Sequence, residues 1–354
     1  MEEKKDTLGM LDLVIRPGFC VKENQIIKVN QAAESLFITP GTDVRPLLLT
    51  GSEEYAAFTG GCLYLTLSLS SHSCGASVTR VDDIDVFLLE QESDNGELRS
   101  MALAARELRE PLTNVMITAD SLFPLCAAES SPRTAEQVAR LNRGLFQILR
   151  IIGNMSDAER CAAVSHQETV DIPALFAEFF EKAEALVSHT GITLTYEGPD
   201  QPIYGLADRE QLERAVLNIL SNAIKFTPKG GTVTAKLTRS GRMLRLSVTD
   251  SGSGIAQSVR SSVFSRYLRQ PALEDSRYGI GLGMVLIRTA AAHHGGTVLI
   301  DQPDGAGTRI TMTMSIRQSK QATLRSNVLR VDYAGERDHG LIELSECLPT
   351  ELYE

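Results

Sequence analysis

Three polar side chains lie at helical spacing within the otherwise largely apolar segment 213–231 (ERAVLNILSNAIKFTPKGG). Asn218, Asn222 and Lys225 are at positions i, i+4 and i+7, which places all three on one face of an α-helix. An amide oxygen can ligate Mg²⁺ without adding charge, and an ammonium group can neutralise a phosphate. The face therefore suits a metal-bound phosphate, although a solvated polar stripe has the same spacing.

A carboxylate and two glycines follow an apolar run in the segment 250–255 (DSGSGI). Asp250 comes at the end of a predicted strand, where its carboxylate can accept a hydrogen bond from an exocyclic amine. Gly252 and Gly254 lack side chains, so that the backbone beside them can approach a flat ring. These residues are suited to holding a nucleotide base.

Two further glycine-rich turns come later in the chain. The segment 279–284 (GIGLGM) opens an apolar helix, so that its backbone amides and the helix dipole would face a phosphate. The segment 304–308 (DGAGT) lies between two predicted strands. The residues that could contact a nucleotide in these turns are Gly279, Gly281, Leu282, Gly283 and Thr308.

The order of these motifs is more specific than any one of them. A dinucleotide-binding βαβ unit is excluded, because no strand leads directly into the glycines. The series resembles the ATP-binding domain shared by histidine kinases, gyrase, the Hsp90 chaperones and MutL, and it is most similar to sensor histidine kinases over residues 171–316. The resemblance implies a Bergerat-type α/β sandwich that binds ATP and Mg²⁺.

The same resemblance implies a role for each matching residue. Asn222 would ligate Mg²⁺ with help from Asn218, Lys225 would meet a phosphate, and Asp250 would hold the adenine amine. The segment 263–269 (VFSRYLR) resembles the lid of the family, in which Arg269 would reach the γ-phosphate. An amphipathic helix that packs its aromatic side chains inward would give the same pattern, and both interpretations can hold together.

One position separates the subgroups of this family by chemistry. Relatives that hydrolyse ATP carry Glu as a general base where this chain has Asn218. Because an amide cannot deprotonate water, Asn218 favours the histidine-kinase arrangement over a hydrolysis-driven machine.

A change of period at 92–96 (ESDNG) indicates a boundary, after which apolar residues recur at helical spacing. Two helices joined by the turn 130–133 (SSPR) are predicted to form an antiparallel hairpin that dimerises into a four-helix bundle. The predicted stripe of the first helix comprises Met101, Leu103, Leu108, Leu112, Val115 and Met116. The stripe of the second comprises Val138, Leu141, Leu145, Ile148, Leu149 and Ile152.

The segment 101–115 (MALAARELREPLTNV) resembles the phosphoacceptor helix of histidine kinases, whose signature is His-Glu-Leu-Arg-x-Pro-Leu. Arg106 stands at the histidine position, and Glu110 stands where phosphatase-competent relatives carry Thr or Asn. A guanidinium stays protonated and has no lone pair with which to attack phosphorus, which argues against phosphoryl acceptance at Arg106. Glu110 in turn argues against the phosphatase reaction on this helix. Glu107 is either the remnant of a general base or, with Arg106, a solvated charge.

The remaining histidines occur outside such a helical context and are interpreted as surface or structural residues: His72, His166, His189, His293, His294 and His339. The N-terminal segment 17–37 resembles the opening of a PAS sensor domain, with strand, tight turn, strand and a short helix near Ala32. The C-terminal stretch contains a predicted strand over 327–334 and an apolar-acidic segment, 341–349 (LIELSECLP), with no assigned role.

Composition limits the classes of function. Acidic residues outnumber basic ones by 45 to 35, which argues against binding to nucleic acid backbones and anionic membranes. The six cysteines form no C-x-x-C pair and are expected to be reduced core thiols. The sequence shows no signal peptide or membrane span, so we expect a cytoplasmic protein.

The predicted organisation is α+β and multidomain. It comprises a PAS-like unit (8–91), a phosphoacceptor-like hairpin (97–162), an ATPase domain of histidine-kinase type (170–317) and a C-terminal extension (318–354). Three hypotheses remain open. The chain is a dimeric histidine-kinase homologue of two-component signalling that works with a response regulator, a pseudokinase that binds ATP and docks a catalytic kinase or regulator, or a kinase for a histidine on another protein.

Overall fold

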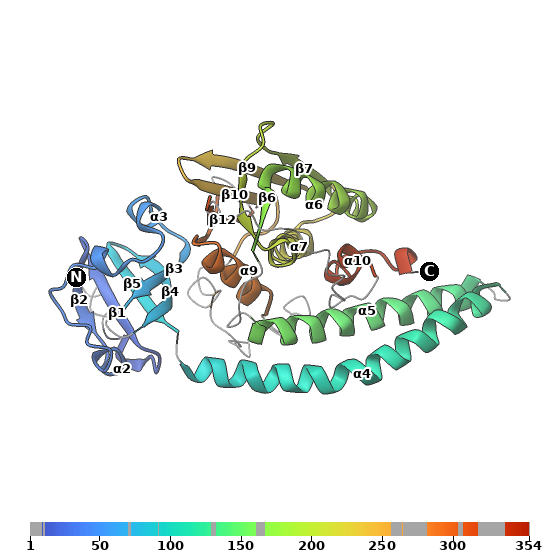
Figure 1. Cartoon of the computed structure of the whole chain (residues 1–354), viewed down its shortest axis with the longest axis horizontal. Coiled ribbons are helices and arrows are strands. Elements are labelled where there is room, and N and C mark those ends of the chain that lie inside the picture. The colour runs from blue at the N-terminus through green and yellow to red at the C-terminus, as the bar shows by residue number, and fades with distance from the viewer. Residues whose placement is uncertain are drawn as a thin grey trace.

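The computed structural model describes residues 9, 11–69, 72–90, 92–128, 132–160, 167–255, 264, 282–303, 307–317 and 337–353. In Figure 1 an N-terminal unit lies at one end, two long helices run along one side, and an α/β unit lies above the helices. The C-terminal helix α10 (His339–Glu343) lies between the long helix α5 and helix α7 of the α/β unit.

The N-terminal unit is an antiparallel sheet with the strand order β2-β1-β5-β4-β3. The turn between β1 and β2 places Glu23 and Asn24 in the left-handed region, with φ of 52° and 65°, which suits a two-residue hairpin turn without glycine. The strands are β1 (Gly18–Lys22), β2 (Gln25–Val29), β3 (Cys62–Ser68), β4 (Ser73–Val81) and β5 (Ile84–Leu89). The helices are η1 (Leu11–Leu13), α2 (Gln31–Glu34), η2 (Arg45–Leu47) and α3 (Ser52–Ala56).

The two long helices are α4 (Glu92–Ala128) and α5 (Pro132–Arg160), which pack along each other. The polar stretch 92–96, where the sequence indicates a boundary, forms the first residues of α4, which begins at Glu92. Acidic residues are favourable in the first turn of a helix, where they interact with the helix dipole, so this polar stretch suits a helix start as well as a loop.

The apolar stripe predicted for the first helix is divided between two faces. Leu112 and Met116 are buried, whereas Leu103, Leu108 and Val115 are at least half exposed. The buried face also carries small residues, namely Ala102, Ala105 and Ala119. In α5 the same division leaves Leu141 and Ile148 exposed. The sequence pattern combined an internal face with a second apolar face that is exposed in the described part of the chain.

The α/β unit packs helices against a mixed sheet. Its strands are β7 (Thr193–Glu197), β9 (Thr232–Ser240), β10 (Met243–Asp250), β11 (Val298–Asp301) and β12 (Arg309–Ser315), with β6 (Glu168–Asp171) and β8 (Tyr204–Ala207) paired separately. Its helices are α6 (Ile172–Val187), η3 (Ser188–Thr190), α7 (Arg209–Phe226) and α9 (Leu282–His293). Strands β9 and β10 pair antiparallel on either side of Gly241.

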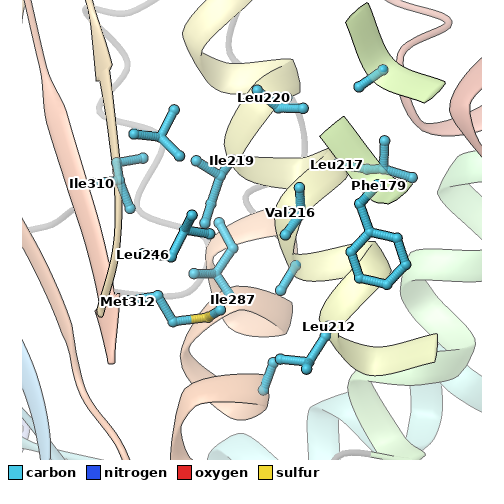
Figure 2. Packing of buried hydrophobic residues seen from close by; sticks show 14 of the residues in the cluster. Phe179, Leu212, Val216, Leu217, Ile219, Leu220, Leu246, Ile287, Ile310 and Met312 are labelled. Carbon is cyan, nitrogen blue, oxygen red and sulfur yellow. The ribbon is translucent and has the colours of Figure 1, made fainter. Parts of the chain in front are cut away.

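The core of this unit lies between the sheet and helices α7 and α9. Figure 2 shows Leu246 of β10 and Met312 of β12 facing Ile219 of α7 and Ile287 of α9, while Phe179 of α6 packs beside Leu217. These side chains are at most 4% exposed. The long apolar side of α7 is therefore anchored, and its polar residues keep a fixed orientation.

The two sheets join into one ten-stranded sheet through antiparallel pairing of β3 with β11. Arg288 of α9 reinforces the junction, because its Nη1 lies 2.5 Å from Glu90 Oε1 and its guanidinium stacks over the ring of Tyr64. The sequence predicted separate units and not this edge-to-edge pairing.

The C-terminal segment 337–353 comprises α10 and the 3₁₀-helix η4 (Thr350–Tyr353). Its apolar side chains, Ile342, Leu344, Leu348 and Tyr353, are at most 2% exposed and belong to the main core. The segment is thus an integrated part of the fold. The strand predicted over 327–334 lies outside the described residues.

Four cysteines are free thiols, as expected: Cys20, Cys62 and Cys74 are buried and Cys347 is partly buried. Burial raises the pKa of the Cys62 thiol well above its ordinary value. Within the described ranges no helix is both long enough and apolar enough to cross a bilayer.

His294 fastens the end of α9 to the start of α7 and makes stability depend on pH. The backbone N–H of Asp208 donates to His294 Nε2 over 3.0 Å, and His294 Nδ1 lies 2.7 Å from the carbonyl oxygen of Ala290, to which it donates as the neutral tautomer. Burial lowers the pKa of His294 below its ordinary value of 6.5. The folded protein therefore favours the neutral form of the His294 imidazole.

We expect the free energy of unfolding to fall as pH drops below about 6.5, because the unfolded chain then binds a proton that the folded chain excludes. A His294→Gln variant should lose part of this slope, whereas His189→Gln, at an exposed position, should retain it. Urea denaturation followed by circular dichroism between pH 5 and pH 8 measures both slopes. Equal slopes in wild type and His294→Gln would contradict the assignment.

Candidate functional site

Helix α7 presents the three predicted polar residues from a rigid position. The side chain of Asp208 caps the helix by accepting a hydrogen bond from the backbone N–H of Gln211. The helix ends at Phe226, before Thr227 and a proline-glycine turn. Most of its residues between Leu212 and Ile224 are buried, so the orientation of Asn218, Asn222 and Lys225 is set by core packing.

Asn218 is 1% exposed, and the nitrogen and the oxygen of its side-chain amide have different surroundings. Its Nδ2 donates to the backbone oxygen of Arg214 over 2.9 Å and to Glu343 Oε2 over 3.4 Å. Its Oδ1 is buried and accepts no hydrogen bond within the part of the chain that the structure describes. A buried amide oxygen without a donor is costly, and a cation would satisfy it.

The other two residues of this face point to different neighbours. Asn222 Nδ2 lies 3.9 Å from the sulfur of Met284 at the start of α9. Lys225 Nζ lies 2.7 Å from Glu346 Oε2 of the C-terminal segment. Asn218 and Asn222 therefore both meet the start of α9, whereas Lys225 meets a carboxylate that the sequence did not connect with it.

Asp250 ends strand β10 and organises the two glycine turns beside it. Its Oδ1 accepts hydrogen bonds from the backbone N–H groups of Gly252, over 2.8 Å, and Thr308, over 3.2 Å. Burial raises the pKa of Asp250 above its ordinary value, although these two donors oppose the shift. The carboxylate is thus held in a fixed, largely desolvated position, as a base-recognition group requires.

Close backbone approaches explain two of the glycines around Asp250. A Cβ atom on Gly252 would lie 2.5 Å from the backbone oxygen of Phe226 at the end of α7. Gly307 has a φ of +99°, and a Cβ atom there would lie 1.9 Å from the backbone oxygen of Asp250. These contacts bring the end of α7, the end of β10 and the turn before β12 together.

The start of α9 is the third element of the candidate site, after α7 and the end of β10. A Cβ atom on Gly283 would lie 2.8 Å from Asn218 Oδ1, so this helix end packs directly on α7. Leu282 and Val285 are buried and pack against Met101 of α4 and Met155 of α5. The predicted site residues Arg269, Gly279 and Gly281 lie outside the described residues, and Gly254 lies beside Gly307.

Arg106 and Glu107 are both exposed on α4, and Glu110 is exposed one turn later. The helix continues through Pro111. Exposure suits the interpretation of Arg106 and Glu107 as solvated charges and leaves the remnant of a general base as the alternative.

A buried charged network beside this site escaped sequence analysis. Glu343 of α10 is fully buried, and its carboxylate lies 3.1 Å from Arg214 Nη2 and 3.3 Å from Arg150 Nε. Arg214 also pairs with Asp157 and donates to Asn154 Oδ1 over 2.6 Å. The only trace of this network in the sequence is the regular placing of acids among apolar residues in 341–349.

Comparison with known proteins gives matches that agree with these observations. Residues 207–318 match the family described as histidine kinase-, DNA gyrase B-, and HSP90-like ATPase. An uncharacterized sensor-like histidine kinase of Rhizobium meliloti (strain 1021) is 29% identical over 73% of this chain and 52% of its own length. The adaptive-response sensory kinase SasA of Synechocystis sp. is 30% identical over 61% of this chain and 58% of its own length.

Among solved structures, full-length ShkA in complex with AMPPNP is similar over 70% of this chain and 54% of its own length, with a TM-score of 0.51 and 22% identity. That level of identity supports a shared fold. This chain spans just over half the length of the three matched proteins.

Proposed function

The chain belongs to the sensor histidine kinase family, and from this premise we propose that it binds Mg²⁺-ATP between α7, the end of β10 and the start of α9. The observation that carries the proposal is the buried, unpartnered Oδ1 of Asn218 within the described residues, facing the start of α9. Asn222, one turn away, is the second amide that would hold Mg²⁺. The metal would neutralise phosphate charge and orient the triphosphate.

Each of the remaining residues would contact a different part of the nucleotide. Asp250 would accept the amine of adenine, with Gly252, Gly254 and Thr308 lining the base. Lys225 would meet a phosphate, and Leu282 and Gly283 begin a helix whose N-terminus would face the phosphates. Arg269, Gly279 and Gly281 are proposed to act with them on the strength of sequence alone.

We propose that the other parts follow the organisation of the family. The strand order β2-β1-β5-β4-β3 supports a PAS-like sensor unit over 8–91, and the packing of α4 on α5 supports a helical hairpin over 97–162. Exposed apolar residues on the hairpin support a homodimer that buries them in a four-helix bundle: Leu103, Leu108, Val115, Ile117, Leu122, Leu141 and Ile148.

Phosphoryl transfer is proposed to be altered at the acceptor position. Arg106 is exposed on α4, where a nucleophile would be accessible, but its guanidinium has no lone pair for attack on the γ-phosphorus. The chain would then act in cytoplasmic two-component signalling as an ATP-dependent module that docks a response regulator or a catalytic kinase. The alternative is a kinase whose acceptor histidine lies on another protein.

Incubation of the purified protein with Mg²⁺ and γ-labelled ATP tests this proposal. We expect no acid-labile label on the wild type and measurable label on Arg106→His, because the substitution restores only the nucleophile. Label on the wild type that is stable to base and labile to acid would overturn the pseudokinase interpretation. Absence of label on both proteins, together with absence of ATP binding by calorimetry, would remove the proposed site.

A further inference from the structure

The C-terminal segment places two carboxylates against the polar face of α7. Glu346 Oε2 lies 2.7 Å from Lys225 Nζ, and Glu343 Oε2 lies 3.4 Å from Asn218 Nδ2. Lys225 and Asn218 are two of the three residues of α7 that the proposed function assigns to phosphate and Mg²⁺. The segment thus brings negatively charged oxygen atoms to the groups that would receive a triphosphate.

The charge state of Glu346 fits this position. Burial by itself would raise the pKa of Glu346, but Arg150 and Lys225 outweigh that effect and lower the pKa below its ordinary value. Arg150 Nη1 lies 3.1 Å from the same Oε2 atom that Lys225 contacts. At neutral pH the carboxylate is therefore an anion held between two cations, as a phosphate oxygen would be.

Helix α5 holds the segment through its backbone. Arg143 donates from Nε to the carbonyl oxygen of Ser345 over 2.8 Å and from Nη2 to that of Glu346 over 3.0 Å. Asn142 donates to the carbonyl oxygen of Tyr353 over 2.8 Å, and the ring of Tyr353 packs edge-on against Phe146. These contacts fix the position of Glu346 opposite Lys225, so the pair is a built feature of the fold.

We propose that residues 337–353 are an intramolecular competitor of the nucleotide, in which the Glu346 carboxylate takes the place of a phosphate on Lys225. The inference rests on the proposed function and adds its regulation. The Lys225 ammonium has three donors, but a phosphate on it would place negative charge beside the Glu346 carboxylate, and the repulsion between the two anions makes the two pairings oppose each other. The ATP-bound form would require Glu346 to leave.

The same segment joins the ATPase unit to the hairpin, because α10 lies between α5 and α7 (Figure 1). A ligand shifts a conformational equilibrium only by its differential affinity for the two states. Mg²⁺-ATP would favour the state in which Lys225 is released from Glu346, and would thereby loosen the link between the nucleotide site and the hairpin. Nucleotide occupancy would in this way be communicated to the surface that a partner docks on.

Calorimetry of ATP binding to a Glu346→Gln variant tests the competition. Loss of a partly exposed charge-assisted pair should tighten Mg²⁺-ATP binding by about three- to tenfold. Glu351→Gln is the matched control, because Glu351 is exposed in the same segment and its replacement removes the same charge. Its affinity for ATP should equal that of the wild type.

The outcomes separate the inference from the function on which it rests. Equal or weaker binding by Glu346→Gln, with measurable binding by the wild type, would overturn the competition and leave the ATP site intact. Absence of ATP binding by both proteins would overturn the ATP site and the competition together.

Cys347 provides a second measurement in the wild-type protein. Its sulfur lies 3.4 Å from the backbone oxygen of Ser221 on α7, and burial raises its pKa, so the docked segment protects the thiol. Mg²⁺-ATP should increase the rate of Cys347 alkylation severalfold, as measured by peptide mass spectrometry. Adenosine, which lacks phosphates, should leave the rate unchanged. An unchanged or slower rate with saturating Mg²⁺-ATP would contradict displacement of the segment.

Discussion

A Glu343→Ala variant is expected to lose about 3 kcal/mol of unfolding free energy, because it leaves two buried guanidinium groups short of a partner. Glu343 is fully buried between Arg150 and Arg214, whose side chains are 10% and 4% exposed. Breaking a buried ion pair from one side costs about 3 to 5 kcal/mol. The lower end applies here, since Glu346 still pairs with Arg150 and Asp157 with Arg214.

Glu136→Ala is the control for this measurement. Glu136 pairs with Arg140 on the surface of α5, with both side chains at least 60% exposed, and such pairs contribute about 0.5 kcal/mol or less. Urea denaturation followed by circular dichroism compares the two variants. If Glu343→Ala is no less stable than Glu136→Ala, the network does not join α5, α7 and α10 as the structure indicates.

An Asp250→Asn variant is expected to bind ATP about 30- to 100-fold more weakly, which corresponds to about 2 to 3 kcal/mol. The asparagine oxygen can still accept the hydrogen bonds from Gly252 and Thr308, so the turn keeps its shape. The amide nitrogen, however, would present a donor to the donating amine of adenine. Isothermal titration calorimetry with Mg²⁺-ATP measures the loss.

The choice of nucleotide makes this prediction specific. Guanine presents an acceptor oxygen where adenine presents the amine, so the preference of Asp250→Asn for ATP over GTP should shrink or reverse. Asp200→Asn, which changes an exposed carboxylate, should retain the preference of the wild type. Unchanged ATP affinity in Asp250→Asn, with an unchanged melting temperature, would place the base elsewhere.

Local sequence periodicity was sufficient to predict the helix and the strand that carry the proposed site. Helix α7 spans Arg209–Phe226 and includes the three polar residues expected on one helix face, and Asp250 ends β10 as expected. Asn and Lys at helical spacing define a face within a single helix, and glycines mark turns by their own backbone freedom. Both properties depend on neighbours in sequence and are therefore visible without a structure.

The assignment of apolar residues to faces was less complete. The stripe predicted for the first long helix combined buried Leu112 with exposed Leu108, because a helix with two apolar faces has no single preferred direction in sequence. A different ambiguity applies at Glu92, where a polar stretch suited either a loop or a helix start and the structure shows a helix. Which face of a long helix is buried depends on what packs against the helix.

The sequence by itself determined the order of the motifs proposed to bind the nucleotide, the presence of Arg106 at the position proposed for the acceptor histidine, and the α+β character of the chain. Only the tertiary structure decided that β3 pairs with β11 and that Glu346 pairs with Lys225. Strand edges pair through backbone groups that every residue carries, and ion pairs between distant segments leave no periodic pattern. Such contacts form when packing brings together residues more than a hundred positions apart. They can therefore be identified only in the folded structure.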